Sequence, residues 1–342
     1  MRPIVLNARA ASRPELGGVE RWARELTTRL PALAPDRYVV ARPPAALVHR
    51  AGHAWEQVSL PLRARRAGAG LILSPANTAP VVWPRNVLML HDAAPLREPR
   101  WYSRSYVAWQ RLLLPVLTRR ACHVLTVSEF SAGEIVDLLH VSPERITVVP
   151  GGVDERFRPE ADADGARAAL GLQRPYVLTV ASATARKNLA ALAPAADRLR
   201  QRGVDLVVAG GDRPQFRDEP TTGALRRVGP VPDEHLPGLY AGAAAFVLPS
   251  LYEGFGLTCL EAMAAGTPVL ASDRGALPET CGDGALFVDP TDSAAIAVGI
   301  ERLLDDQGLC QTLREAGRIR AAGFTWPAAA QAIDALLAGL NR

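Results

Sequence analysis

AAFVLPSLYEGFGLTCLEAMAAG (residues 244–266) passes from an apolar run through a glycine-rich turn into a stretch with helical periodicity. The apolar run AAFVLP (244–249) predicts a buried strand, and the periodic stretch predicts a helix that begins near Leu257 and ends at Gly266. A buried strand followed directly by a helix is the repeating unit of parallel α/β sheets. This stretch therefore favours an α/β fold.

The turn inside this stretch has the composition of a ligand loop. Gly254 and Gly256 flank Phe255 and let the backbone turn sharply and approach a ligand closely. Amides at the start of the following helix would form a seat for phosphate oxygens. Glu253 and Glu261 bracket that seat, and carboxylates accept hydrogen bonds from sugar hydroxyls. The residues alone leave open that both glutamates are simply solvated.

Short apolar runs alternate with helical stretches along the rest of the chain as well. A segment rich in Gly, Pro and acidic residues, PGGVDERFRPEADADG (150–165), interrupts the alternation and predicts an interdomain linker. The predicted strands are 3–7, 37–41, 70–74, 86–90, 123–127 and 146–150 before the linker, and 176–180, 205–210, 226–229, 244–249, 268–273 and 285–289 after it. Helices are predicted over 104–119, 129–140 and 324–341, and from about 188, 233 and 257.

Two parallel-sheet domains are therefore expected in a chain of 342 residues, with a cleft between them if the two sheets face each other. Ligands of open parallel sheets bind beyond the carboxyl ends of the strands, so loops that follow strands should carry the chemistry. A dinucleotide oxidoreductase would show G-x-G-x-x-G after the first strand, whereas the first loop here has only Gly17-Gly18.

Composition excludes several other classes of protein. Apolar residues make up 48% of the chain, and no run of 18 apolar residues predicts a membrane span. The four cysteines are scattered without a CxxC pair, which is typical of a reducing compartment and predicts a cytoplasmic protein. The only D-x-D, Asp162-Ala163-Asp164, lies in the predicted linker and is a poor candidate for holding a metal ion.

The positive charge is concentrated in the first half of the chain. Residues 1–150 contain 20 basic and 11 acidic residues, a net charge of +9, whereas residues 151–342 contain 19 and 24, a net charge of −5. This asymmetry predicts peripheral contact of the N-terminal domain with an anionic membrane face, although arginines scattered over solvated surfaces would give the same count. Lys187 is the only lysine among the 39 basic residues and follows a predicted strand.

The spacing E-G-F-G-x-x-x-x-E, from Glu253 to Glu261, resembles the donor-site signature of the family 4 retaining glycosyltransferases. The resemblance covers nearly the whole chain in the expected order. The other segments that carry it are GGVE (17–20), LHD (90–92), TVSEFSAGEI (126–135), VVPGGVD (148–154), RRVGPVPDEHLPGLYAGA (226–243) and FTW (324–326).

The resemblance implies the GT-B fold, with two facing Rossmann-like parallel-sheet domains and an inter-domain cleft. Residues 1–155 would form an N-terminal acceptor-binding domain, and residues 165–322 a C-terminal domain that binds the nucleotide sugar. A C-terminal helix, 325–342, would pack back on the N-terminal domain.

The same resemblance implies roles for single residues of the C-terminal domain. Glu261 would hold the ribose hydroxyls, and Glu253 would contact hydroxyls of the donor sugar. The turn from Gly254 through Phe255 and Gly256 to Leu257 would meet that sugar and the phosphates. Gly229 and Val231 would lie in the segment that holds the base.

The charged groups of the reaction are implied in the same way. Arg186 and Lys187 would supply positive charge to the diphosphate, and His91 would lie near the transferred sugar. Gly17 and Gly18 would let the N-terminal domain close on the diphosphate or the acceptor, although a structural turn is nearly as good a reading of these two residues. Many family members carry Gly-Arg where this chain has Ala181-Ser182, which puts the role of Arg186 in doubt.

The implied reaction is retaining transfer of a hexose, with mannose from GDP-mannose favoured, from a nucleoside diphosphate sugar to a hydroxyl of a glycan or lipid-linked saccharide. No metal, other cofactor or nucleic acid is expected to take part. The alternatives are a sugar-nucleotide epimerase or hydrolase of the same fold, a glycan-binding protein without catalysis, and transfer of glucose, galactose, rhamnose or fucose.

Overall fold

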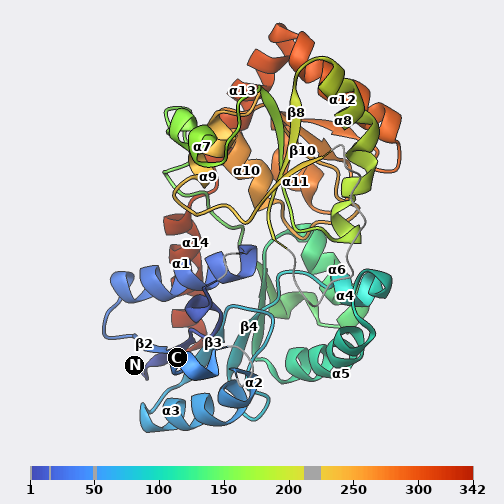
Figure 1. The fold of residues 1–342 in the computed structure, drawn as a ribbon. Coiled ribbons are helices and arrows are strands. Elements are labelled where there is room, and N and C mark those ends of the chain that lie inside the picture. Colours follow the sequence, from blue (N-terminus) through green and yellow to red (C-terminus); the bar gives the residue numbers. More distant parts are fainter. Residues whose placement is uncertain (1, 15–16, 49–51, 212–224, 342) are drawn as a thin grey trace. The chain divides into compact units, whose positions relative to one another are not determined.

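The computed structural model describes residues 2–14, 17–48, 52–211 and 225–341. The chain divides into two compact units, each built on one six-stranded sheet (Figure 1). Unit 1 comprises Met1–Arg97, Val107–Gly152 and Thr325–Arg342, and unit 2 comprises Glu98–Tyr106 and Val153–Phe324. From the sequence we predict domains of 1–155 with 325–342, and of 165–322.

Unit 1 contains a parallel sheet with the strand order β2-β1-β3-β4-β5-β6. Ile4 in β1 pairs with Tyr38 in β2 on one side and with Leu71 in β3 on the other. The strands are β1 (Ile4–Asn7), β2 (Tyr38–Ala41), β3 (Leu71–Ser74), β4 (Asn86–Met89), β5 (His123–Thr126) and β6 (Ile146–Val148). The helices are α1 (Gly18–Leu33), α2 (Gly52–Ala54), the π-helix η3 (Trp55–Ser59), α3 (Leu60–Arg66), α4 (Ala94–Arg97), α5 (Arg104–Arg120, whose first turn belongs to unit 2), α6 (Glu129–Leu139) and α14 (Trp326–Leu340).

Unit 2 contains a second parallel sheet, with the strand order β12-β11-β10-β7-β8-β9. Its strands are β7 (Tyr176–Val180), β8 (Asp205–Ala209), β9 (Arg226–Gly229), β10 (Ala245–Leu248), β11 (Val269–Ser272) and β12 (Ala285–Val288). Its helices are α7 (Ala163–Ala169), the 3₁₀ turns η6 (Ala185–Lys187) and η7 (Leu189–Leu192), α8 (Ala193–Gln201), α9 (Leu236–Ala241), α10 (Leu257–Ala264), α11 (Leu277–Cys281), α12 (Ser293–Asp305) and α13 (Gln307–Ala322).

Every strand predicted from the sequence is present, and the most apolar of these runs are buried on both faces of their sheets. All four residues of β10 are buried, as are those of β1, β3 and β4. The predicted linker ends earlier than expected, since α7 begins at Ala163 with Asp162 as its N-cap. The helix predicted from about 188 begins as 3₁₀ turns and becomes α-helical only at Ala193.

The core of unit 2 joins strands β7, β8, β10 and β11 to helices α8, α12 and α13 in one cluster of apolar side chains. The sequence analysis assigns no helices to α12 and α13. Gly317 in α13 lies close to Met263 in α10 and to the backbone of Gly284, so this crossing of helices requires a small residue. The packing holds α10, and with it the turn that precedes it, against the sheet.

Helix α14 is part of unit 1, although 172 residues of unit 2 separate it from the preceding segment of unit 1. Trp326, at the start of α14, is buried and packs edge-to-face on Trp22 of α1, with ring centroids 4.9 Å apart. Asp334 accepts hydrogen bonds from Arg37 (2.6 Å) and Tyr38 (2.5 Å). A Cβ atom on Gly152 would lie 2.0 Å from the backbone nitrogen of Trp326, so the chain leaves unit 1 in direct contact with the start of α14.

Because no side chain fits there, we expect Gly152→Ala to displace the start of α14 and lower the free energy of unfolding by about 2 kcal/mol or more. Gly339→Ala is the matched control: Gly339 lies in α14, is exposed, and its Cβ would meet nothing within 4 Å. That control should leave stability unchanged or raise it by up to about 1 kcal/mol. Urea unfolding measures both variants, and equal stabilities would contradict the packing argument.

Candidate functional site

In the sheet of unit 2, successive strands are added outward on one side of β7 and then, from β10 onward, on its other side. Reading β9-β8-β7-β10-β11-β12, the chain fills one half of the sheet from β7 outward and then returns to start the other half at β10. In open parallel sheets, ligands bind at such a switch point, beyond the carboxyl ends of the two strands. The loop after β7 carries Arg186 and Lys187, and the loop after β10 carries Glu253. The topology therefore brings three of the predicted site residues to one edge.

These three charged side chains form a buried ionic cluster. Lys187 Nζ donates a short hydrogen bond to Glu253 Oε1, and an Arg186 guanidinium nitrogen donates to Glu253 Oε2 at 3.1 Å. The side chains of Lys187, Arg186 and Glu253 are 11%, 13% and 8% exposed. Ser250, which is fully buried, donates from its hydroxyl to Glu253 Oε1 at 2.8 Å. Ser250 was not among the residues predicted from the sequence.

The electrostatics of the cluster keep Glu253 ionised. Burial by itself would raise the pKa of Glu253, but Lys187 and Arg186 beside it, with hydrogen bonds from Lys187 and Ser250, hold that pKa at about 2. Burial lowers the pKa of Lys187, which Glu253 opposes and Arg186 reinforces. Lys187 and Arg186 both donate to the one carboxylate of Glu253.

Asn188 fixes the two loops relative to each other. Its backbone is left-handed (φ 55°), and its side-chain amide donates to the carbonyl oxygens of Pro249 (3.1 Å) and Pro290 (2.7 Å). The backbone N–H of Leu251 also donates to the carbonyl of Arg186 at 2.9 Å. The sequence analysis missed Asn188, and the available signal was an asparagine, which tolerates this backbone region, directly after Lys187.

The glycines of the turn meet steric demands within unit 2 itself. Gly256 is the N-cap of α10 with φ 98°, and a Cβ there would lie 2.5 Å from Leu277 Cδ2. Gly275 (φ 63°) lies against the Glu253 backbone, where a Cβ would come within 2.6 Å of the carbonyl oxygen. The Phe255 ring packs edge-to-face on Phe324, with centroids 5.8 Å apart. The side chain of Phe255 thus packs within unit 2.

Glu261 lies in the second turn of α10 and is 3% exposed. The phenol of Tyr240 in α9, itself fully buried, donates to Glu261 Oε2 at 3.0 Å. Glu253 is likewise 6% exposed, so the alternative that both glutamates are solvated is wrong. Each carboxylate is held by named donors, as a binding residue requires.

The predicted base-binding residues lie at the end of β9. Gly229 has φ 71°, and its carbonyl accepts from the N–H of Gly210 at 2.9 Å, at the end of β8. Val231 follows and is half-buried. A Cβ on Gly210 would lie 2.3 Å from the carbonyl oxygen of Ala181. The ends of β7, β8 and β9 therefore lie side by side at the edge that carries the cluster.

Unit 1 places its predicted residues at the equivalent edge of its own sheet. Gly17 is the N-cap of α1, and its N–H donates to Glu20 Oε2 at 3.2 Å, while Gly18 is exposed with open space around its Cα. Trp22 of the same helix packs edge-to-face on His91, with ring centroids 5.9 Å apart. The structure therefore brings α1 and His91 together.

The His91 imidazole is buried and neutral. Its Nε2 lies 2.9 Å from the carbonyl oxygen of Pro75 and so carries the proton, which leaves the lone pair on Nδ1. Burial lowers the pKa of His91, against smaller opposing effects from the Pro75 carbonyl and from Asp92 and Glu20. A neutral imidazole at neutral pH can orient a hydroxyl group, but it has no second proton to give.

A second buried network in unit 1 was missed by the sequence analysis. Glu56, in the π-helix η3, accepts from Asn7 (2.5 Å) and Thr78 (3.0 Å), and Arg9 lies 3.5 Å from it and donates to Thr78 at 2.8 Å. Asn7 ends β1 and Thr78 follows β3, the two strands at the switch point of this sheet. The network links the loops at this edge of the sheet, and no motif in the sequence predicts it.

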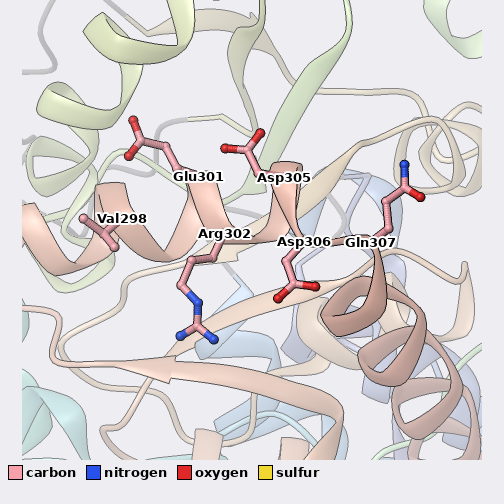
Figure 2. A pocket seen from close by; sticks show the side chains of 6 residues that line it. All are labelled: Val298, Glu301, Arg302, Asp305, Asp306 and Gln307. Atoms are coloured by element: carbon pink, nitrogen blue, oxygen red, sulfur yellow. The ribbon is translucent and has the colours of Figure 1, made fainter.

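Among the described residues, no three or more His, Cys, Asp or Glu side chains group as they would around a metal ion. Asp162 of the D-x-D accepts from the N–H of Gly165 as a helix cap. An open hollow at the junction of α12 and α13 contains none of the predicted site residues (Figure 2). It is lined by Val298, Glu301, Arg302, Asp305, Asp306 and Gln307.

We expect Asn188→Gly to keep the left-handed backbone but lose both side-chain hydrogen bonds, lowering the free energy of unfolding by about 2 kcal/mol. Asn188→Ala should cost roughly 1 kcal/mol more, because alanine also disfavours this φ. His140→Gly is the control: His140 caps α6 with φ 54° and is exposed, so glycine should be neutral or stabilising there. Chemical denaturation compares the stability of the three variants. If Asn188→Gly were as stable as the parent, the two hydrogen bonds of the Asn188 amide would contribute nothing to stability.

The depressed pKa of Glu253 predicts an acid-dependent loss of stability. Its contribution is complete above an unfolded pKa near 4.5 and is lost as the pH falls toward the folded value of about 2. The shift corresponds to about 3 kcal/mol at pH 7, of which about 2 kcal/mol is gone at pH 3. The stability gap between the parent and Glu253→Gln should therefore narrow by about 2 kcal/mol from pH 7 to pH 3. Glu301→Gln changes an exposed ion pair, so its free energy of unfolding should vary with pH as that of the parent does. If the free energy of unfolding of Glu253→Gln also ran parallel to that of the parent from pH 7 to pH 3, the pairing of Glu253 with Lys187 and Arg186 would be contradicted.

The chain is similar in sequence and in fold to known glycosyltransferases. A family model described as "Glycosyl transferases group 1" matches residues 162–320, and one described as "Glycosyltransferase Family 4" matches residues 16–157. Sucrose-phosphate synthase from Thermosynechococcus elongatus superposes with a TM-score of 0.78 at 23% identity, covering 99% of both chains. That likeness shows a shared fold of the GT-B type, with two Rossmann-like parallel-sheet domains.

Two curated relatives are similar in sequence. O-antigen chain mannosyltransferase B from Escherichia coli is 32% identical over 255 residues, which cover 71% of this chain and 67% of that protein. MMP alpha-(1->4)-mannosyltransferase from Mycolicibacterium hassiacum is 36% identical over 247 residues, which cover 68% of this chain and 56% of that protein. The matches span between about half and two thirds of these relatives. With both family models matched in order along the chain, this protein belongs to the group 1, family 4 glycosyltransferases.

Proposed function

We propose that this glycosyltransferase moves a hexose from a nucleoside diphosphate sugar to a hydroxyl of a glycan or lipid-linked saccharide, with mannose from GDP-mannose as the favoured donor. The anomeric configuration is retained, and no metal takes part. One observation carries the proposal: Lys187 and Arg186 both donate to Glu253 in a buried cluster at the switch point of unit 2.

A diphosphate is the ligand that this cluster fits best. Its negative charge would meet Lys187 and Arg186, together with the first amides of α10, whose N-cap Gly256 has no side chain to occupy them. The cations are held in place before any ligand arrives, by Glu253 and by the carbonyl of Tyr252, which accepts from Arg186 at 2.9 Å. Such preorganised charge costs no rearrangement when the reaction occurs.

Each of the other predicted residues would contact a different part of the donor. Glu261, oriented by Tyr240, would accept hydrogen bonds from the ribose hydroxyls, and the backbone beside Gly229 and Val231 would hold the base. Glu253 would both position the two cations and accept a hydroxyl of the sugar. These assignments rest on the resemblance of the motif together with the burial of both carboxylates.

The chemistry follows from where charge develops. The bond between the sugar C1 and the phosphate oxygen breaks, and the leaving diphosphate gains negative charge that Lys187, Arg186 and the amides of α10 stabilise. The acceptor oxygen bonds to C1 on the same face, and its proton passes to the departing phosphate oxygen. Glu253, with its pKa near 2 and its oxygens bound to two cations, is a poor nucleophile, so no covalent glycosyl-enzyme is expected.

The choice of sugar rests on the two relatives that are named mannosyltransferases. Transfer of glucose, galactose or rhamnose is the nearest alternative, because the residues of the cluster contact the diphosphate that all these donors share. A sugar-nucleotide epimerase or hydrolase of the same fold is the second, since it would use the same diphosphate site without an acceptor.

A nucleotide-release assay across GDP-, UDP-, dTDP- and ADP-sugars tests the proposal, run with and without lipid-pyrophosphate-linked and soluble saccharide acceptors. We expect GDP release from GDP-mannose that depends on the acceptor, and an α-linked product by NMR. Equal release without any acceptor would instead assign hydrolysis, and conversion of the donor without release would assign epimerisation. A product in which the anomeric configuration of the sugar is inverted would contradict the proposed retaining mechanism.

In the same assay we expect Lys187→Arg to lower kcat by roughly 10²–10³-fold while the protein stays folded, because a guanidinium cannot occupy the buried place of the ammonium beside Arg186. Arg198→Lys is the matched control, since Arg198 forms an exposed ion pair with Glu301 outside the cluster. Circular dichroism checks the fold of both variants. If Lys187→Arg turned over the donor at the parental rate, the proposed role of Lys187 in the reaction would be contradicted.

A further inference from the structure

His91, in the loop after β4, is hydrogen-bonded through its main chain and its ring. Its backbone N–H donates to Asn77 Oδ1 at 2.8 Å, and its ring Nε2 donates to the carbonyl of Pro75 at 2.9 Å. Its carbonyl oxygen accepts from the hydroxyl of Ser131 in α6 at 3.1 Å. Asn77 and Pro75 both belong to the loop that follows β3. That one loop therefore holds the main chain and the imidazole of His91 together.

Asn77 extends the hydrogen-bond ladder between β3 and β4 beyond the end of β3. In a parallel pair, a residue donates its N–H to one carbonyl of the neighbouring strand and accepts the N–H that lies two residues further along that strand. The N–H of Asn77 donates to the carbonyl of Met89 at 2.9 Å, and its side-chain oxygen accepts the N–H of His91. The amide oxygen of Asn77 thus replaces the main-chain carbonyl that a regular strand would supply.

The backbone at this position favours asparagine. Asn77 has φ 58°, in the left-handed region that asparagine and glycine adopt more readily than other residues. Ser74, at the end of β3, pairs with Leu88, so regular pairing would place Ala76 beside Leu90. Asn77 takes that place one residue later, and its side chain supplies the acceptor. Glycine would keep this backbone but would lose the hydrogen bond.

Thr78, the next residue, anchors the same loop in the buried network of Glu56. Its hydroxyl donates to Glu56 Oε1 at 3.0 Å and accepts from Arg9 at 2.8 Å. All three side chains are buried, with at most 7% of each exposed. The loop that holds His91 is therefore itself held by η3 and by the residues after β1. A functional side chain keeps its geometry when the residues around it are fixed in this way.

We propose that Asn77 is a positioning residue for sugar transfer, which holds His91 so that the imidazole presents the lone pair of Nδ1 to the transferred sugar. The inference rests on the proposed function and on the implied place of His91 near that sugar. Because the carbonyl of Pro75 keeps the proton on Nε2, Nδ1 is an acceptor with one direction. A shift of the main chain at His91 would turn that direction away from the sugar. Asn77 acts through His91, without contact with the donor.

Two variants of Asn77 test the positioning in the nucleotide-release assay. Asn77→Gly should lower kcat about tenfold and change the KM for the donor less than twofold, because the diphosphate and the base are bound by unit 2. Asn77→Asp keeps an acceptor of the same shape and should retain at least half of the parental kcat. A carboxylate would favour a protonated imidazole, so the assay is run at pH 8. The matched control is His140→Gly, at an exposed residue with φ 54°, which should keep the parental kcat.

A double-mutant cycle separates positioning from a general loss of structure. His91→Ala should lower kcat at least as much as Asn77→Gly does. In the His91→Ala background, Asn77→Gly should then change kcat less than twofold, because the group on which it acts is gone. A further tenfold loss in that background would overturn the proposal. So would a parental kcat for Asn77→Gly, or a loss in Asn77→Asp as large as that in Asn77→Gly.

Nitrogen NMR of the histidine rings measures the positioning without any substrate. Comparison with the spectrum of His91→Ala identifies the His91 signals, which in the parent should show a neutral ring with its proton on Nε2. Asn77→Gly should shift or broaden these signals, whereas Asn77→Asp and His140→Gly should keep the proton on Nε2. Unchanged His91 signals in Asn77→Gly would overturn the proposal. If the parent transferred no sugar, the proposed function would fail, and these spectra would still decide whether Asn77 holds His91.

Discussion

The buried pairing of Glu253 with Lys187 and Arg186 is the interaction on which the candidate site depends. A carboxylate at this depth is stable only because two cations and the Ser250 hydroxyl surround it. The cations in turn come from a loop that packs against the Glu253 loop, so the electrostatics and the loop conformations depend on each other. The cluster thus holds two cationic side chains in fixed positions inside unit 2.

Backbone constraints hold that cluster in place. Gly275 lets its own loop touch the Glu253 backbone, and Gly256 lets α10 begin against Leu277. Asn188 links the loops that follow β7, β10 and β12 through two carbonyls. Asn188 and Gly256 lie in the loops after β7 and β10, the two strands at the switch point of the sheet, where ligands of open parallel sheets bind. Topology and side-chain chemistry therefore select the same place.

Much of this architecture could be predicted from the sequence. The central strands were predictable because runs such as AFVL (245–248) are buried on both faces and so are apolar throughout. The helices α12 and α13 were not assigned. The 3₁₀ start after Asn188 was missed because a left-handed residue, set by contacts with Pro249 and Pro290, overrides the helical pattern.

For the site, the sequence by itself determined which residue types are present and in which loops they lie: a lysine after β7, two glutamates eight residues apart, and glycines between them. Only the tertiary structure decided that Glu253 pairs with Lys187 and Arg186 and that Glu261 pairs with Tyr240. It also decided which apolar residues of α5 are buried, such as Leu114 and Leu117, and which are exposed, such as Leu112. The physical reason is that ion pairing and exposure depend on neighbours 21 to 67 residues away in the chain, and local periodicity carries no information about them.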